Sequence, residues 1–403
     1  LLFKILKREI SAEMFTYLSY PKQEELINAF TSPEIKGMLE NLYSDDIIDF
    51  IEELPSNLVK KILQAASEDQ RTEINLLLSY PEDSAGSMMT TEFVELKETD
   101  TVKQAIARIK TQGRVAETIT NCYVVDQNRV LVGSIRLREI LFANEDELIS
   151  ELMDTDVISV MTNDDQEVVA NVFKKYDFSV LPVVNDEKRL IGIITADDII
   201  DVLYEETTED IQKMAAIMPT EGSYIETSIL DMAKSRITWL IILMVSATFT
   251  GFIIQGYEST LALIPALAAS MPMIMSTAGN AGSQSSIMVI RGISVDDMTI
   301  KDIGLVVWKE LQVGFVIGVM MFVVNVLRLL IFTPDVGLMT DLVISGTVFI
   351  TILMAKVTGG LLPLVALIFK QDPAAMASPL ITTIVDALAL IVYFNLAIRF
   401  LAI

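Results

Sequence analysis

The sequence has almost no residues of the kinds that build disulfides or soft-metal sites. Its 403 residues include one cysteine, Cys122, and no histidine. A single cysteine excludes a disulfide within the chain and fits a cytosolic setting for the polar part of the sequence. Zinc and copper sites are usually built from His and Cys, so a dedicated site for these metals is not expected. Metals that prefer oxygen ligands, such as Mg²⁺, Ca²⁺ and Mn²⁺, remain.

Motifs of catalysis are also missing. We find no P-loop, no nucleophile elbow and no pairing of His with Cys. An ATP-driven pump needs a nucleotide-hydrolysing motif, so this class is excluded on sequence. The sequence predicts that the protein is not an enzyme.

Basic residues are scarce: 30 Lys and Arg stand against 54 Asp and Glu, giving a net charge of −24 in a chain that is 52% hydrophobic. High charge and high apolarity conflict within a single globular domain. Nearly all of the excess negative charge lies in residues 1–238, and residues 239–403 are almost neutral and strongly apolar. We therefore expect an acidic soluble part followed by a membrane part. The acidic potential repels nucleic acid, so no nucleic-acid partner is expected, and it attracts cations.

The first part of the chain has a helical pattern. Apolar residues recur at three- and four-residue spacing in IIDFIEEL and LVKKILQAA, and prolines separate these segments. Residues 1–86 are expected to form a small all-α domain. The opening segment, LLFKILKREI, is too short and too charged for a signal peptide and indicates a truncated start of that domain.

An internal repeat follows. CYVVDQNRVLVGSI (122–135) aligns with LPVVNDEKRLIGII (181–194), and each copy reads as strand, turn, strand and acidic helix start. This β-α-β-β-α unit, used twice over 87–147 and 148–204, resembles a tandem CBS pair. The resemblance implies a nucleotide site at Thr195 and Asp198 in the second copy, for ATP or another adenine nucleotide. The alternative is that Asp198 only caps the following helix.

The remainder of the chain alternates between linker and apolar segments. Residues 205–237 are expected to form a long connecting helix, broken near Pro219. Five apolar stretches, at about 239–257, 261–290, 304–333, 342–369 and 377–402, predict an all-α transmembrane domain over 238–403. Bases and acids alternate between the short loops, which places the N-terminal domain in the cytoplasm and the C-terminus outside.

Asp386 is the residue most suggestive of function. It lies in an apolar stretch, and a carboxylate near the middle of a membrane span costs roughly 2.5–3.5 kcal/mol, so its presence indicates a use such as ion binding. Ser378, Thr382 and Asp386 share one face of a helix at four-residue spacing. In the second stretch, Asn280 belongs to the polar run TAGNAGSQSS, which predicts a pore lining rather than lipid contact.

The whole arrangement resembles the MgtE family of magnesium channels. The motifs that carry the resemblance are YPEDSAGSMMT (80–90), YDFSVLPVV (176–184), the Gly-Asn-Ala-Gly-Ser-Gln run at 279–284 and PLITTIVDALALIVYF (379–394). It implies a multi-pass homodimer among plasma-membrane lipids, with the second and fifth spans lining a pore. It also implies that Asp386 holds the transported Mg²⁺; Mn²⁺ and Co²⁺ remain open as further ions.

The resemblance further implies cytosolic Mg²⁺ sites that close the pore. Crowded carboxylates repel one another, and a divalent cation relieves that repulsion. The residues implied in the N-terminal domain, the second CBS copy and the connecting helix are Asp45, Asp49, Asp165, Glu167, Asp177, Asp198, Asp201, Glu206, Glu209 and Asp210.

Two other functions are compatible with the sequence. One is an exchanger that couples Mg²⁺ to Na⁺ or H⁺. The charged residue Lys356 in the fourth apolar stretch keeps this alternative open. The other is a membrane-anchored sensor of metal or nucleotide that transports nothing. The polar residues on two separate spans argue against the sensor, and the isolation of Asp386 argues against a proton relay.

Overall fold

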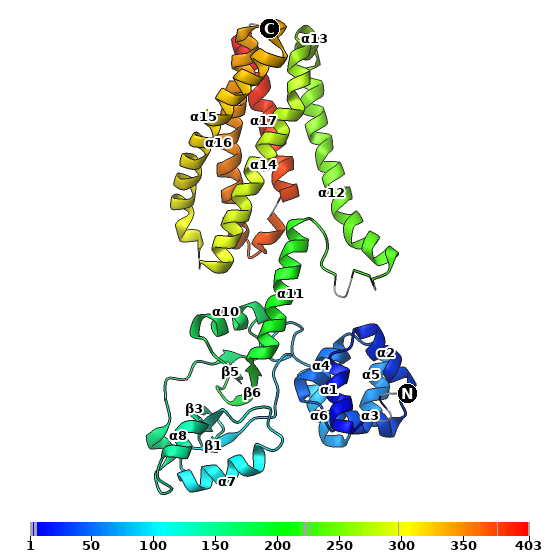
Figure 1. Ribbon diagram of the computed structural model, residues 1–403, viewed down its shortest axis with the longest axis vertical. Coiled ribbons are helices and arrows are strands. Elements are labelled where there is room, and N and C mark those ends of the chain that lie inside the picture. The colour runs from blue at the N-terminus through cyan, green and yellow to red at the C-terminus, as the bar shows by residue number, and fades with distance from the viewer. Residues whose placement is uncertain are drawn as a thin grey trace. The chain divides into compact units, whose positions relative to one another are not determined.

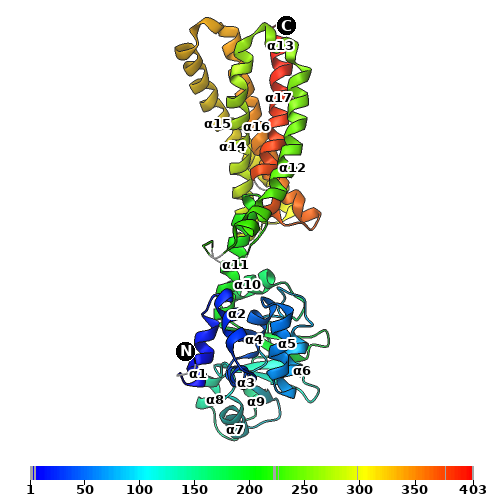
Figure 2. The same cartoon turned by 90° about the vertical axis from the view of Figure 1, so that its right-hand side faces the viewer.

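The computed structural model describes residues 3, 6–220, 224–225, 227–296, 298–376 and 378–401. The chain divides into two compact units, Leu1–Glu206 and Thr207–Ile403, which we describe separately. Figures 1 and 2 show the elements of each unit from two sides.

The first unit begins with six short helices. Their boundaries follow local signals: Thr31 and Ser67 each form a capping box with a residue three positions later, and Pro21 and Pro33 lie in the first turns of their helices. The predicted all-α domain is confirmed. The helices are α1 (Arg8–Thr16), α2 (Tyr20–Ala29), α3 (Ser32–Leu39), α4 (Ser44–Glu52), α5 (Ser56–Ala65) and α6 (Glu68–Leu77).

The predicted repeat is also confirmed, as two three-stranded sheets of the same topology. In the first copy β1 (Glu95–Lys97) pairs parallel with β2 (Asn121–Val125), which pairs antiparallel with β3 (Leu131–Arg136). In the second, β4 (Val160–Met161), β5 (Val180–Val184) and β6 (Leu190–Thr195) pair in the same way. The helices of the two copies are α7 (Val102–Gln112), α8 (Leu137–Phe142), α9 (Ile149–Leu152), α10 (Gln166–Tyr176) and α11 (Ala196–Met214).

The N-terminal helices and the second repeat share one hydrophobic core. Ile48 of α4 belongs to the same buried cluster as Phe173 of α10 and Ile199 of α11, whereas the first repeat has its own core around Ile109 and Ile140. Burying such large apolar side chains contributes roughly 1.5–3 kcal/mol each. This shared core fixes the first turn of α4 beside the first turn of α11.

The second unit is a bundle of long helices. They are α12 (Ile229–Gly256), α13 (Glu258–Leu263), α14 (Pro265–Val295), α15 (Ile303–Phe332), α16 (Leu338–Ile368) and α17 (Ser378–Leu401), with short 3₁₀ turns η1 (Ile300–Asp302), η2 (Pro334–Val336) and η3 (Pro373–Met376). Its core lies between α14, α16 and α17, where Ile274, Ile352 and Tyr393 are fully buried. The Tyr393 hydroxyl donates a hydrogen bond to the Leu267 carbonyl at 2.9 Å.

Among the described residues, four segments are long and apolar enough to cross a membrane: Ile229–Gly256, Ile300–Phe332, Leu338–Ile368 and Pro373–Leu401. The remaining predicted span, α14, is a helix of 31 residues that falls short on apolarity. Its polar run between Gly279 and Ser286 explains the difference. It nonetheless packs against both α16 and α17 within the bundle (Figure 1).

The connecting segment differs from expectation. The helix was predicted to break near Pro219; it ends earlier, at Met214, and Ala216 adopts a left-handed conformation with φ of 54°. Part of the predicted break, Glu221 and Gly222, lies outside the described residues. A new helix, α12, begins at Ile229, about three turns before the predicted span, because Ser228 accepts a hydrogen bond from the Asp231 amide and caps it.

Candidate metal sites

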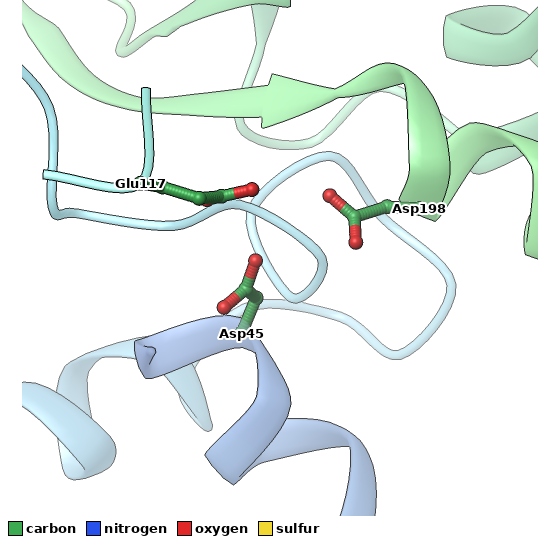
Figure 3. A group of neighbouring side chains, drawn as sticks. All are labelled: Asp45, Glu117 and Asp198. Atoms are coloured by element: carbon green, nitrogen blue, oxygen red, sulfur yellow. The ribbon is translucent and has the colours of Figure 1, made fainter. Parts of the chain in front are cut away.

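Three carboxylates in the first unit converge on one point. Asp45 lies in the first turn of α4, Glu117 in the loop after α7 and Asp198 in the first turn of α11 (Figure 3). One oxygen from each lies within 4.8 Å of the other two. Mg²⁺ binds carboxylate oxygens at about 2.1 Å, so a single ion with some of its water could bridge them.

Burial makes this arrangement costly when no cation is bound. Asp45 is only 6% exposed, and Glu117 Oε2 is buried without a hydrogen-bond partner among the described residues. Burial and the charges of Asp198 and Glu117 raise the pKa of Asp45 well above its usual range. Burial, together with the Asp198 charge, raises the pKa of Glu117 to about 7, and burial raises that of Asp198 to about 6. None of the ion pairs within the described residues involves these three acids.

Two of the three acids are among the predicted regulatory residues, and the third, Glu117, is not. Its neighbours in sequence contain no acidic pattern, so only the fold reveals it. Asp49, one turn beyond Asp45, is exposed at the edge of the cluster, where the charge of Asp198 acts on it. Asp46 of the same helix adds a further negative charge.

The predicted nucleotide residues lie at the start of α11. Asp198 Oδ2 accepts hydrogen bonds from the Thr195 amide at 3.3 Å and the Thr195 hydroxyl at 2.7 Å. This is the geometry of a helix cap, the alternative reading of Asp198. The same carboxylate faces Asp45 and Glu117, so the residue that caps α11 is also a candidate metal ligand.

Three other predicted ligands are spread along α10. Asp165 caps its start, accepting a hydrogen bond from the Glu167 amide at 2.9 Å, and Asp177 ends it in a left-handed conformation. The eleven residues of α10 lie between Asp165 and Asp177, so twelve helical steps separate the two acids by about 18 Å. Asp165 and Asp177 therefore cannot bind the same ion within this chain.

The predicted acids on and beyond the middle of α11 have separate surroundings. Asp201 is exposed, and Glu206 accepts a hydrogen bond from the Gln166 side chain at 2.8 Å. Asp210 is half-buried. Glu209 forms an ion pair with Lys213 at 2.7 Å, and Lys213 also pairs with Asp372 at 2.6 Å. Both carboxylates raise the pKa of Lys213, overcoming the opposing effect of its partial burial.

In the second unit, Asp386 of α17 lies against α14. A Cβ atom placed on Gly279 of α14 would stand 3.6 Å from Asp386 Oδ1 and 3.0 Å from the Thr382 methyl group. The half-buried Asp386 carboxylate makes no hydrogen bond or ion pair within the described residues. Glycine at 279 thus lets the two helices approach closely at the level of an unpaired charge.

The other predicted pore residues occupy the same two helices. Asn280 is exposed on α14 and donates a weak hydrogen bond of 3.4 Å to Ser276. The Thr382 hydroxyl donates to the Pro379 carbonyl at 2.9 Å, so its oxygen offers an acceptor for water rather than a free donor. The side chain of Ser378 lies outside the described residues.

The bundle also contains a second acid that the sequence analysis did not single out. Glu310 of α15 accepts a hydrogen bond of 2.5 Å from Ser285 of α14. Lys356 of α16 donates to Gln284 of α14 at 3.3 Å. The signal that could have revealed Glu310 is its place inside a long apolar stretch, the same signal that identified Asp386.

Models of known families match most of the chain. The intracellular N domain of MgtE matches residues 1–83, the CBS domain matches 85–146 and 149–205, and a divalent cation transporter domain matches 271–396. With its several membrane-spanning helices, the chain is a multi-pass membrane protein.

Known proteins similar to this chain include two bacterial magnesium transporters named MgtE. The one from Bacillus subtilis is 34% identical over 363 residues, which cover 90% of this chain and 80% of the relative. The one from Thermus thermophilus is 32% identical over 396 residues, covering 98% and 87%.

Two solved structures are similar to the first part of the chain. One is the soluble part of a magnesium transporter, 37% identical, covering 51% of this chain and 81% of the other, with a TM-score of 0.49. The second is the cytosolic domain of the Mg²⁺ channel MgtE in complex with ATP, 34% identical, covering 50% and 82%, with a TM-score of 0.48. Because its similarity to full-length relatives extends through soluble and membrane parts alike, the chain belongs to the MgtE family of magnesium transporters.

Proposed function

We propose that this protein is a Mg²⁺-selective channel for uptake across the plasma membrane, and that cytosolic Mg²⁺ closes it. The observation that carries the proposal is the unpaired carboxylate of Asp386, held where α17 meets α14 at Gly279. An uncompensated negative charge inside a bundle of apolar helices attracts a cation. A membrane potential of 100 mV supplies about 4.6 kcal/mol to move two charges inward, so uptake needs no other energy source.

The side chains around Asp386 favour a largely hydrated ion. Mg²⁺ gives up its water reluctantly and is usually held by one or two carboxylates with several waters retained. Asp386 offers one carboxylate, and Asn280 and Thr382 offer neutral oxygen atoms on the same two helices. Such a set suits outer-sphere contact with a hydrated Mg²⁺ better than full coordination by protein. Mn²⁺ and Co²⁺ could use the same ligands.

A homodimer would complete the pore. Asn280 and Gln284 are exposed on α14 although their helix belongs to a membrane bundle. Asn280 makes a weak hydrogen bond to Ser276, and Gln284 accepts one from Lys356 through its oxygen, so lipid contact would leave the remaining amide groups unsatisfied. A second copy of the chain covering this face is therefore favoured. Two-fold symmetry would then bring two Asp386 carboxylates to one axis, giving a divalent ion two opposing charges.

The carboxylate cluster supplies a mechanism for closure. With Mg²⁺ bound, Asp45 of the helical domain and Asp198 of the second CBS copy are drawn together through the ion. Without it, the buried acids repel one another, and the helical domain separates from the repeat. Asp49 of α4 and the acids on and flanking α10 and α11 would respond to Mg²⁺ through further sites. These acids are Asp165, Glu167, Asp177, Asp201, Glu206, Glu209 and Asp210.

Orientation and nucleotide binding complete the proposal. Lys234 and Arg236 in the first turns of α12 favour a cytoplasmic position for the soluble part, with the C-terminus outside. At the second CBS copy, Thr195 and Asp198 could contact the ribose of ATP, which would then compete with the metal for Asp198.

The test is Mg²⁺ flux into liposomes containing the purified protein, with Mg²⁺ varied on the side of the soluble part. Asp386→Asn should abolish flux, and Glu258→Gln, an equivalent change at an exposed position on α13, should not. Flux that survives Asp386→Asn, or that ignores Mg²⁺ on the soluble side, would contradict the proposal. Flux that appears only with a Na⁺ or H⁺ gradient would indicate an exchanger.

A further inference from the structure

Lys356 is a buried base in the middle of the bundle. Its side chain is 5% exposed on α16, and its ammonium donates to Gln284 Oε1 on α14 at 3.3 Å. A buried ammonium is expensive unless it is hydrogen-bonded and compensated by a nearby negative charge. The acid whose charge acts on it is Glu310 of α15.

Glu310 is bound to the residue next to Gln284. Its carboxylate accepts the Ser285 hydroxyl at 2.5 Å. Consecutive residues of α14 are therefore each bound by a charged side chain, one positive and one negative, from two other helices. The two charges hold this turn of α14 in one rotation relative to α15 and α16.

Close packing keeps these charges in place. A Cβ atom on Gly359 of α16 would lie 2.1 Å from the Gly282 carbonyl oxygen, so the two backbones are in direct contact. A Cβ on Gly360 would lie 3.1 Å from the Glu310 side chain. Glycine at both positions therefore lets α16 pack closely against α14 and against the Glu310 side chain.

The pair lies next to a polar stripe on α14 that includes Asn280, one of the residues that the proposed function assigns to the ion. Ser276, Asn280 and Gln284 follow one another at four-residue spacing and so share one face of α14. Gln284 is about 7.5 Å along the helix axis from Gly279, which packs against Asp386. An ion moving along this stripe meets the Gln284 amide one turn beyond Asn280.

We propose that Lys356 is a positioning residue for ion release and that Glu310 is its counter-charge. Together they present a neutral amide, Gln284, beside Asp386 in place of a second negative site. Conduction requires an ion to bind firmly enough to enter the pore and weakly enough to leave it. The compensated pair leaves Asp386 as the dominant charge on the path, and the inference rests on the proposed channel function.

Removing one charge or the other should shift the apparent affinity of flux for Mg²⁺ in opposite directions. Lys356→Met leaves Glu310 uncompensated beside the stripe, so the Mg²⁺ concentration for half-maximal flux should fall about five- to tenfold, with a lower maximal rate. Glu310→Gln leaves the ammonium uncompensated, so this concentration should rise by about the same factor. The double variant should return close to the original value.

A purely structural role would give another result. Both single variants would then lower the amount of folded protein or the maximal flux, without shifting the half-maximal concentration in opposite directions, and the double variant would not recover. That result would overturn the inference. Lys309→Met, which removes an exposed lysine from α15, is the matched control and should leave the half-maximal concentration unchanged.

The controls separate this inference from the proposed function. Absence of Mg²⁺ flux in the unmodified protein would contradict the channel itself. Normal flux with unshifted or parallel changes in the two single variants would contradict only the role of the pair. If Lys356→Met does not fold, Lys356→Gln removes the same charge and should shift the half-maximal concentration in the same direction.

Discussion

The ammonium of Lys213 lies 2.6 Å from the carboxylate of Asp372 and 2.7 Å from that of Glu209. Lys213 belongs to the last turn of α11, and Asp372 immediately precedes η3 and the start of α17. The lysine therefore ties the connecting helix to the segment that leads into the helix carrying Asp386. This contact needs no bound metal, because the lysine itself supplies the positive charge between two acids.

Removing this ion pair should loosen the closed state. We expect Lys213→Met to raise the cytosolic Mg²⁺ concentration needed for half-maximal inhibition by about three- to fivefold, since a partly exposed pair contributes about 1 kcal/mol. Inhibition curves for liposome flux would measure it. Lys370→Met, a change at an exposed lysine two residues from Asp372, is the control. Equal curves for the two variants would show that the Lys213 contact has no part in closure.

Glu117 should lower the stability of the metal-free protein and raise the stability that bound Mg²⁺ gives. Because its Oε2 is buried without a partner among the described residues, Glu117→Gln should raise the thermal unfolding midpoint in chelator. The same change should reduce the stabilisation that Mg²⁺ gives, and Asp45→Asn should behave similarly. Asp69→Asn, on exposed α6, should alter neither quantity. Loss of stability in chelator for Glu117→Gln would contradict the cluster as a repulsive site.

Protons should compete with Mg²⁺ for the carboxylate cluster near neutral pH. Glu117 has its pKa raised to about 7 and Asp198 to about 6, so both bind protons more readily when folded than when unfolded. Metal-free protein should therefore lose stability as pH rises from about 4 to above 7. Mg²⁺ needs the deprotonated acids, so its inhibition of flux should weaken as pH falls from 8 through 7 to 6. Inhibition that strengthens on acidification would contradict this sign.

The effect of glycine-to-alanine changes on flux and assembly should increase as the space for the new methyl group decreases. The methyl group of Gly251→Ala on α12 would meet nothing within 4 Å, so this change should leave flux and assembly unaltered. Gly279→Ala would press on Thr382 at 3.0 Å and lie 3.6 Å from Asp386, so it should lower flux several-fold with little loss of folded protein. Gly359→Ala would meet the Gly282 carbonyl at 2.1 Å and should prevent normal assembly. Flux and size-exclusion profiles of the three variants test this order.

The sequence predicted those features that depend on local pattern. Periodicity and punctuation by proline identified the N-terminal helices, and the internal repeat identified both sheets, because each strand pair lies close in sequence. Asp386 was identifiable because a single acid in an apolar stretch is rare. The linker was less predictable, since a left-handed residue such as Ala216 leaves no signature in composition.

The site residues that sequence analysis missed depend on tertiary contacts. Glu117 joins Asp45 and Asp198 only because α4 and α11 share a core, and no spacing rule connects these three positions. Lys356 was noticed for its charge, but its partner Gln284 is on another helix. Conversely, Asp165 and Asp177 were both predicted as metal ligands of the second CBS copy and are separated by the length of α10.

The low apolarity of α14 has a consequence for how the protein is made. A helix that carries Asn280, Gln284 and several serines partitions weakly from the translocon into lipid by itself. Its burying partners, α16 and α17, are synthesised later. Stable insertion of α14 therefore has to wait until the chain from Leu338 onward has been made, and a nascent chain that stops after α15 would leave α14 without a lasting place in the bilayer.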